Sequence, residues 1–248
     1  MKRIGIVVSA AIALALSSPL FAADKPLTED TGQQILKELR EIRQVLEKQQ
    51  RPQLQQAPAR PETVTIRGGG AHTLGKPDAP LVLIEYTDYQ CPYCKRFADT
   101  TFTEIKRNLI DTGKVQFISR NLPLPFHSNA QKAAQAALCA GEQGKYWEMR
   151  GLLFRDQSKL DRESIAGYAK DMSLVSDAFK VCMDNEKLMQ AINDEAAYAG
   201  MVGITGTPTF VLGTRAGDSV DGRLIVGAQP YSVFESQVNE LLRQGVKH

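Results

Sequence analysis

The stretch DYQCPYCKRF, residues 88–97, contains two of the four cysteines of the chain, Cys91 and Cys94, three positions apart. It follows a mostly apolar run at 81–87 that predicts a buried strand, and a helix is predicted after Cys91. Cys91 therefore falls at a helix N-terminus, where unpaired backbone N–H groups and the helix dipole stabilise a thiolate. Pro92 fits the first helical turn because its missing N–H would have no partner there. The stretch predicts a redox-active pair, in which Cys91 is the exposed nucleophile and Cys94 is the resolving thiol.

Two other roles for the cysteine pair are less well supported. A zinc site needs four ligands, and the three histidines, His72, His127 and His248, are scattered along the chain without a second close Cys or His pair. A purely structural disulfide between Cys91 and Cys94 would close so small a loop that it would remove little unfolded-state entropy. We therefore expect neither a metal nor another cofactor.

Residues 1–22 have the pattern of a secretory signal peptide. Lys2 and Arg3 precede an apolar run, and small residues around Ala22 suit cleavage. A membrane-spanning helix needs about 20 apolar residues, and this run is shorter and is interrupted by Pro19. We expect an exported protein in an oxidising compartment, where cysteines pair. Without Lys2 and Arg3 the formal net charge of +2 falls to about zero, so no nucleic-acid partner is expected.

Residues 23–50 predict an amphipathic N-terminal helix. Its apolar residues are spaced four, three and four positions apart: Ile35, Leu39, Ile42 and Leu46. Leu at position a and Ile at position d of a heptad favour trimers or tetramers. Two heptads are fewer than a coiled coil normally needs, so a helix that lies on its own domain is the alternative. The Gln- and Pro-rich stretch at 51–61 predicts an extended linker.

Residues 62–248 predict one α/β domain with an all-helical insertion. A strand, the helix after Cys91 and a second strand at 115–121 form a βαβ unit, which implies parallel pairing. Helical patterns then fill residues 128–203. Two strands, the second at 223–229, and a closing helix complete the predicted domain.

Three stretches together resemble the DsbA-like branch of the thioredoxin superfamily. They are IEYTDYQCPYC, PLPFHSNAQKAAQAALCA and GITGTPTFVLG, at residues 84–94, 123–140 and 203–213. The CPYC motif and the Thr207–Pro208 pair are more similar to the DsbG and ScsC types, and the N-terminal helix is similar to that of oligomeric ScsC-type proteins. The resemblance covers about residues 63–244. It implies a thioredoxin-like fold and a thiol-disulfide oxidoreductase of the periplasm.

The resemblance also implies roles for residues around the motif. A cis peptide bond at Thr207–Pro208 would place that turn against the cysteines, and the Thr207 backbone would bind an extended substrate chain. Pro92 and Tyr93, between the cysteines, are expected to contact substrate. Glu85 matches a buried acid of DsbA-like proteins. A carboxylate in a core strand should have a raised pKa and could relay a proton to or from the resolving cysteine; the alternative is a Glu that faces solvent at the sheet margin.

Two further features belong to the helical insertion. The predicted export and the even number of cysteines favour a structural disulfide between Cys139 and Cys182, which would contribute about 3 to 4 kcal/mol if unstrained. Two buried free thiols are the alternative. His127 is interpreted as a structural histidine at a helix start, outside the catalytic set.

These features lead to three functional hypotheses. The first is a periplasmic, homo-oligomeric disulfide isomerase or reductase, with a trimer favoured, that acts on exported proteins with cysteines. A donor oxidase uses the same chemistry, and a holdase chaperone is an alternative of another class. The dithiol of an isomerase or oxidase would exchange electrons with a membrane redox partner of the DsbD or DsbB type.

Overall fold

A computed structural model describes residues 29–56 and 63–245 of the chain. The chain divides into two compact units, one up to Ala59 and one from Arg60 onward. The predicted signal peptide at 1–22 lies outside the described residues. Within the described ranges, no helix is both long enough and apolar enough to cross a membrane.

The first unit contains one long helix, α1 (Glu29–Gln56). The sequence predicted that the helix ends at residue 50 and that a linker follows, but residues 51–56 are helical too, including Pro52. The three Gln and one Leu of this stretch are good helix formers and favour the extension, whereas Pro52 disfavours it. The apolar side chains described on α1 are about half exposed: Ile35 45%, Leu36 53%, Leu39 55%, Ile42 54% and Val45 52%.

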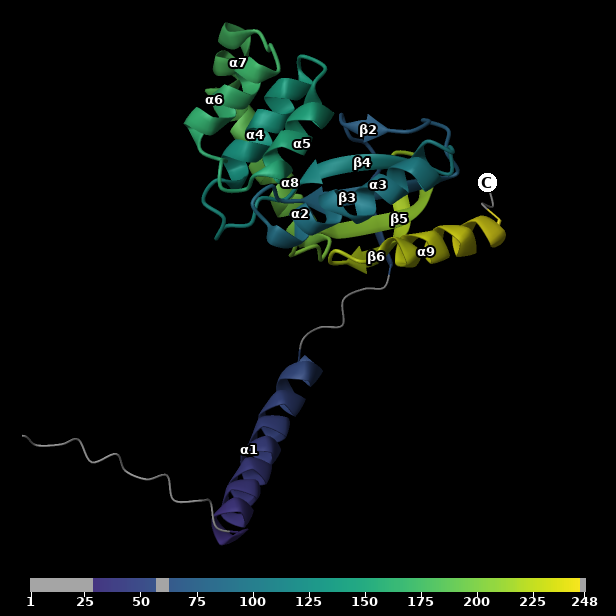
Figure 1. Cartoon of the computed structure of the whole chain (residues 1–248). Coiled ribbons are helices and arrows are strands. Elements are labelled where there is room, and N and C mark those ends of the chain that lie inside the picture. Colours follow the sequence, from purple (N-terminus) through teal and green to yellow (C-terminus); the bar gives the residue numbers. More distant parts are fainter. Residues whose placement is uncertain (1–28, 57–62, 246–248) are drawn as a thin grey trace, which may run out of the picture. The chain divides into compact units, whose positions relative to one another are not determined.

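The second unit is built on a six-stranded sheet in the order β1-β6-β5-β3-β4-β2 (Figure 1). The strands are β1 (Thr63–Arg67), β2 (Thr73–Leu74), β3 (Leu81–Thr87), β4 (Val115–Asn121), β5 (Thr209–Ala216) and β6 (Ser219–Val226). β3 and β4 pair in parallel, as the predicted βαβ unit requires, and the other neighbours are antiparallel. Both strands of the parallel pair are buried along their whole length, because helices cover both faces of the sheet there.

The last strand of the sheet begins earlier than the sequence predicted. β6 starts at Ser219, whereas the predicted strand covered 223–229. A two-residue turn at Gly217 and Asp218 joins β5 to β6, and Gly217 has a φ of 62°. A positive φ suits a tight hairpin turn and is easily adopted by glycine.

Alternate residues of β3 supply two separate cores. Leu81 and Leu83 pack with Phe97, Phe210 and Phe234 on one face of the sheet. The helices on that side are α2 (Pro92–Asp99), α3 (Thr101–Ile105), the π-helical turn η1 (Lys106–Ile110) and α9 (Tyr231–Arg243). Val82, Ile84 and Tyr86 pack on the other face with Ala199 and Ile204. The period-2 alternation of a strand thus joins two helical layers through one central strand.

Five helices lie between β4 and β5. They are α4 (Ala130–Gly141), α5 (Tyr146–Arg155), α6 (Arg162–Asp171), α7 (Ser176–Met183) and α8 (Glu186–Met201). α4–α7 gather at one end of the sheet (Figure 1), and their apolar core also includes Tyr89, Cys91 and Cys94. The insertion therefore packs directly against the predicted redox site.

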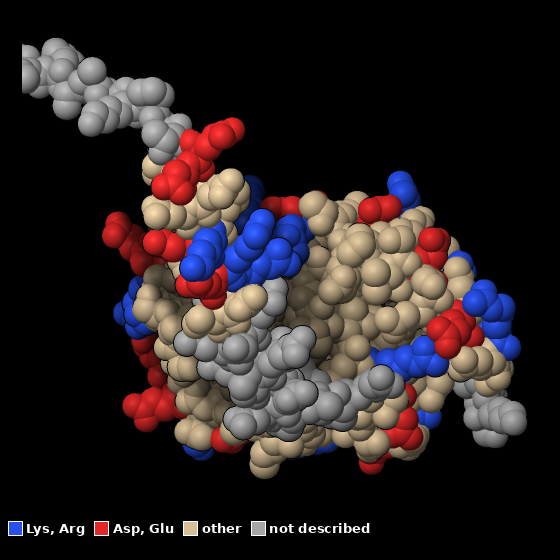
Figure 2. Space-filling model, turned by 90° about the horizontal axis from the view of Figure 1, so that it is seen from below, with Lys and Arg blue, Asp and Glu red and all other residues tan. Residues whose placement is uncertain are grey.

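On the part of the second unit that Figure 2 leaves in view, charged side chains of both signs lie at the edge of a large uncharged area.

A disulfide joins Cys139 on α4 to Cys182 on α7, with 5.7 Å between their Cα atoms. This is the pairing that the sequence predicted. The two cysteines are 43 residues apart, so the bond closes a long loop across the insertion.

We predict that replacing both cysteines, C139A with C182A, lowers the free energy of unfolding by about 4 kcal/mol, the value that a chain-entropy model gives for a loop of this length. Urea unfolding followed by Trp147 fluorescence measures the loss. The unmutated protein under reducing conditions is the control and should lose a similar amount. A loss below about 1 kcal/mol would contradict a stabilising role.

Candidate active site

The two remaining cysteines lie where β3 gives way to α2. Cys91 is the N-cap residue of α2 and Pro92 opens the helix, as predicted, and both thiols are free. The prediction of an exposed Cys91 is wrong: its residue is only 4% exposed, and Cys94 is 0% exposed. Cys91 is covered because the insertion packs around it, yet it is still the more accessible of the two.

The two thiols have opposite acid strengths. The pKa of Cys91 is lowered from 9.0 to about 5, chiefly by a hydrogen bond from the Cys94 thiol, while burial acts in the other direction. Hydrogen bonds from the backbone at Cys94 and Tyr93, in the first turn of α2, also lower the pKa of Cys91. Burial raises the pKa of Cys94 well above 9.0, and its hydrogen bond to Cys91 and the charge there act in the same direction. Cys91 can therefore be a thiolate near neutral pH while Cys94 stays protonated.

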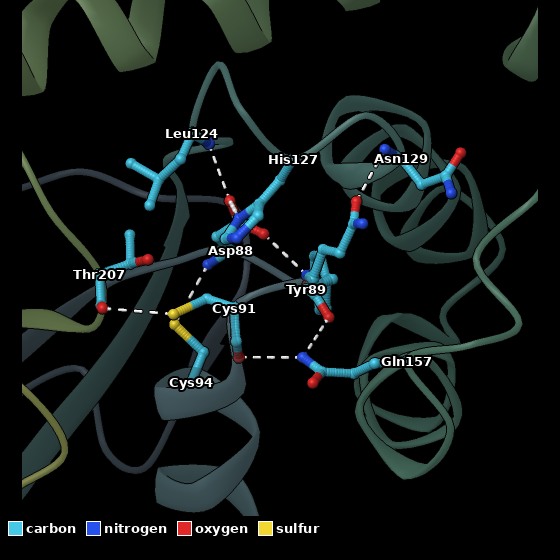
Figure 3. Close-up of polar contacts among 10 residues, drawn as sticks. Asp88, Tyr89, Cys91, Cys94, Leu124, His127, Asn129, Gln157 and Thr207 are labelled. Atoms are coloured by element: carbon cyan, nitrogen blue, oxygen red, sulfur yellow. Dashed lines mark hydrogen bonds and ion pairs between the residues drawn. The ribbon is translucent and has the colours of Figure 1, made fainter. Parts of the chain in front are cut away.

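The turn before β5 faces the first cysteine. The peptide bond between Thr207 and Pro208 is cis, as the resemblance implied. The Cys91 thiol donates a hydrogen bond to the Thr207 carbonyl oxygen, with 3.4 Å between the two atoms (Figure 3). Tyr93 is 58% exposed and Pro92 is exposed beside it. The predicted substrate-contacting residues thus surround the more accessible sulfur.

Glu85 is buried, as predicted, but it is not an isolated acid. The Arg150 guanidinium on α5 donates hydrogen bonds to both Glu85 carboxylate oxygens, at 2.9 and 3.2 Å. Among the described residues, the hydrogen bonds of this carboxylate run to Arg150 and none reaches Cys94. The proton relay predicted from the sequence therefore has no direct hydrogen-bonded path. Arg150 comes from the insertion, and nothing local in the sequence of β3 indicates that it fills this place.

Gln157 is a site residue that the sequence did not suggest. Its side-chain amide donates to the backbone carbonyls of Tyr89 and Cys91, at 2.7 and 2.9 Å (Figure 3). The residue lies between α5 and α6, so the insertion holds both sides of the active-site turn. Gln157 and Cys91 are 66 positions apart in the sequence, and no motif marks the glutamine.

Asp88 and His127 were also missed as a pair. His127 Nδ1 lies 2.7 Å from the Asp88 carboxylate, and Asp88 is three residues before Cys91. The side chain of Asp88 is 0% exposed and that of His127 is 15% exposed. The histidine does precede α4, as predicted, but it also reaches the active-site turn. The available signals were an acidic residue directly after a buried strand and a histidine three positions before a helix, neither of them specific.

No group of three or more His, Cys, Asp or Glu side chains in the described part of the chain is placed to hold a metal ion.

Comparison with known protein families identifies the chain. A family model described as thioredoxin matches residues 68–224, more than half of the sequence. The chain belongs to the thioredoxin family. Cys91 and Cys94, with the Thr207–Pro208 turn beside them, lie within the matched residues.

Solved structures similar to this thioredoxin-family protein belong to the DsbA-like branch, as the sequence motifs implied. Wolbachia pipientis alpha-DsbA1 is 29% identical, with a TM-score of 0.62 over 69% of this chain and 90% of that one. The thiol-disulfide exchange protein alpha-DsbA2 from the same organism is 28% identical, with a TM-score of 0.56 over 68% and 86%. The catalytic domain of Proteus mirabilis ScsC is 27% identical, with a TM-score of 0.55 over 71% and 92%.

Curated relatives match the thioredoxin-family protein over a small part of their own length. A Na(+)/H(+) antiporter NhaA 1 from Salinispora arenicola is 35% identical over 145 residues, which are 58% of this chain and 22% of the relative. An NhaA 3 from Salinispora tropica matches over the same shares. The chain therefore spans less than a quarter of the length of these two relatives. The antiport activity in their names is a property of those proteins.

We predict that iodoacetamide labels Cys91 alone in the reduced, folded protein. The rate should rise through about pH 5, the pKa of Cys91, and level off above it, since only the thiolate reacts. Mass spectrometry of peptides from samples quenched between pH 4 and pH 8 measures both cysteines; unfolded protein, in which both react, is the control. A rate that keeps rising toward pH 9, or equal labelling of Cys94, would contradict the assignment.

Proposed function

We propose that this protein is a periplasmic thiol-disulfide oxidoreductase that acts on exported proteins with cysteines, working as an oligomeric disulfide isomerase or reductase. The observation that carries the proposal is the unequal pair of thiols, with a pKa of about 5 at Cys91 and a strongly raised pKa at Cys94. The similarity to solved structures, among them a thiol-disulfide exchange protein, supports the same chemistry. The signal-peptide pattern at 1–22 supports export.

The proposed reaction begins at Cys91. Its thiolate attacks one sulfur of a substrate disulfide, forms a mixed disulfide and releases the second substrate sulfur as a thiolate. That thiolate can attack another bond of the same substrate, which is isomerisation. Alternatively Cys94 attacks the Cys91 sulfur, which forms the Cys91–Cys94 disulfide and releases a reduced substrate. The Thr207 backbone, already beside the Cys91 sulfur, is placed to bind the substrate chain.

A donor oxidase is a second candidate, and the same pKa favours it. A stabilised thiolate at Cys91 favours the reduced form of the pair, which makes the Cys91–Cys94 disulfide a stronger oxidant. The partner then decides the direction. A membrane reductase of the DsbD type would keep the pair reduced for isomerisation, and an oxidase of the DsbB type would keep it oxidised.

The test of the proposed chemistry is the substitution Cys91→Ser. We predict that the variant loses exchange with a disulfide-bearing substrate by at least about 100-fold, because the attacking thiolate is removed. Refolding of a scrambled, disulfide-bonded protein measures isomerisation, and suppression of aggregation of a cysteine-free protein measures chaperone activity. A holdase would keep its activity in the variant, so full protection without any exchange by the unmutated protein would overturn the proposal.

The redox state of the pair in cells separates the two directions. Trapping by alkylation in the periplasmic fraction should find Cys91 and Cys94 mostly reduced if the protein is an isomerase or reductase. A mostly oxidised pair would support the donor oxidase instead.

The N-terminal helix supports an oligomer. Five apolar residues of α1, between positions 35 and 45, are each 45% to 55% exposed. A helix with such a stripe is stabilised when other helices cover it. Several active sites around one bound chain raise the effective concentration of thiols, which suits repeated exchange on a wrongly paired substrate.

We predict that the full-length protein is a homo-oligomer, with a trimer favoured, and that the double variant L39D with I42D is a monomer. The variant should lose isomerase activity and keep single-site dithiol exchange, because charges in the stripe oppose helix association. Light scattering gives the mass of each. The control is Q34D with Q44D, which adds the same charge to α1 at exposed polar positions and should stay oligomeric. A monomeric full-length protein would contradict the role of α1.

A further inference from the structure

The loop between β4 and α4 is fastened to the active-site turn at three points (Figure 3). The Leu124 backbone N–H donates to the Asp88 carboxylate at 2.8 Å, and His127 Nδ1 lies 2.7 Å from the same oxygen. The Asn129 backbone N–H donates to the side-chain oxygen of Gln90 at 2.8 Å. These contacts join segments 36 to 39 residues apart in the sequence. The loop is thus tied to Asp88 and Gln90, which lie three positions and one position before Cys91.

Asp88 is the centre of this arrangement. One carboxylate oxygen accepts the Gln90 backbone N–H at 2.7 Å, and the other accepts from Leu124 and His127. A carboxylate with no exposed surface requires such donors, since it has lost water. Within the described chain, His127 is the one side chain that donates to it. Loss of the imidazole would leave a buried acceptor site without its partner.

The backbone of Asp88 contacts both cysteines. Its N–H donates to Cys94 Sγ, with 3.5 Å between nitrogen and sulfur, and its carbonyl accepts the Cys91 N–H at 3.1 Å. The Asp88 N–H is one of the groups that favour a thiolate at Cys94. A thiolate at Cys91 is favoured by other hydrogen bonds, chiefly from the Cys94 thiol and also from the backbone in the first turn of α2. The two sulfurs therefore depend on different parts of the site.

We propose that His127 is a positioning residue for the resolving cysteine. Through the Asp88 carboxylate it holds the Asp88 N–H against Cys94 Sγ, where that N–H stabilises the negative charge that Cys94 carries when it attacks. This inference rests on the proposed function and assigns the residue to one step of it.

The step in question breaks the mixed disulfide. The Cys94 sulfur bonds to the Cys91 sulfur while the bond between Cys91 and the substrate sulfur breaks, and the Cys94 proton ends on the released substrate thiol. Two electrons stay with the substrate sulfur, so the substrate leaves reduced and the pair leaves oxidised, without another reactant. His127 touches none of these atoms, and its effect passes through Asp88.

The test is a single turnover of His127→Ala with glutathione disulfide as the probe. Reduced protein is mixed with the probe, quenched in acid at successive times and weighed by mass spectrometry, which separates reduced protein, the Cys91–glutathione adduct and the Cys91–Cys94 disulfide. Resolution by Cys94 should slow about tenfold, the order of effect of a hydrogen bond to a charged group. Formation of the adduct should stay within about twofold, so the adduct accumulates.

Three variants serve as controls. H127N should resolve the adduct at close to the unmutated rate, since the Asn amide can donate from near the position of Nδ1. D88N keeps the shape of the acid but replaces one acceptor oxygen by a donor, and it should be as slow as H127A. H72A removes an imidazole that is half-buried and stacks on Tyr146, and it should leave both steps unchanged. Thermal unfolding confirms that each variant is folded.

The outcomes separate this inference from the proposed function. An unmutated protein that forms neither the adduct nor the Cys91–Cys94 disulfide overturns both. If the unmutated protein forms and resolves the adduct, three results overturn the positioning role alone: normal resolution by H127A, equal slowing of both steps, or an H127N variant as slow as H127A. Slow resolution in H127A and D88N, with rescue in H127N, supports it.

Discussion

A sulfur that is almost without solvent contact can hold a negative charge only where protein groups replace water as hydrogen-bond donors. This constraint governs the site around Cys91, which is 4% exposed. The Cys94 thiol and the backbone at the start of α2 are the donors, and all of them lie within one helical turn. The strand-to-helix junction therefore has to place both cysteines and the helix start within hydrogen-bond distance. Proline at the second position of the motif permits this, because it opens the helix without an unpaired N–H.

The rest of the domain holds that junction in place. β3 is buried on both faces and carries the motif at its end, so the position of Cys91 is set by the central strand of the sheet. The turn before β5 approaches from one side, and Gln157 fastens the backbone from the insertion. The disulfide between α4 and α7 braces the same insertion. The helical insertion is thus a structural part of the active site.

The buried polar groups of the site are divided between support and chemistry. Glu85 and Arg150 neutralise each other below the motif, where an unpaired charge would be strongly destabilising. Asp88 contacts both cysteines directly, because its backbone N–H donates to Cys94 Sγ and its carbonyl accepts from the Cys91 N–H. An acid in the core strand was the natural candidate for a proton relay when only the chain order was known. In the structure, the acid that contacts the cysteines is Asp88, directly after the strand, and His127 binds its carboxylate.

The sequence by itself determined whatever depends on neighbours along the chain. The βαβ order, the cysteines at a helix start, the Pro92 opening and the helical stretch after β4 all follow from local periodicity and end signals, whose physical causes act within a few residues. The match of three short stretches to a family added the Thr207–Pro208 turn. Tertiary structure decided the exposure of Cys91, the partner of Glu85, and the contacts of Gln157 and His127 with the active-site turn. Those contacts join residues 39 to 68 positions apart, and they depend on how the insertion packs against the sheet, which no local pattern encodes.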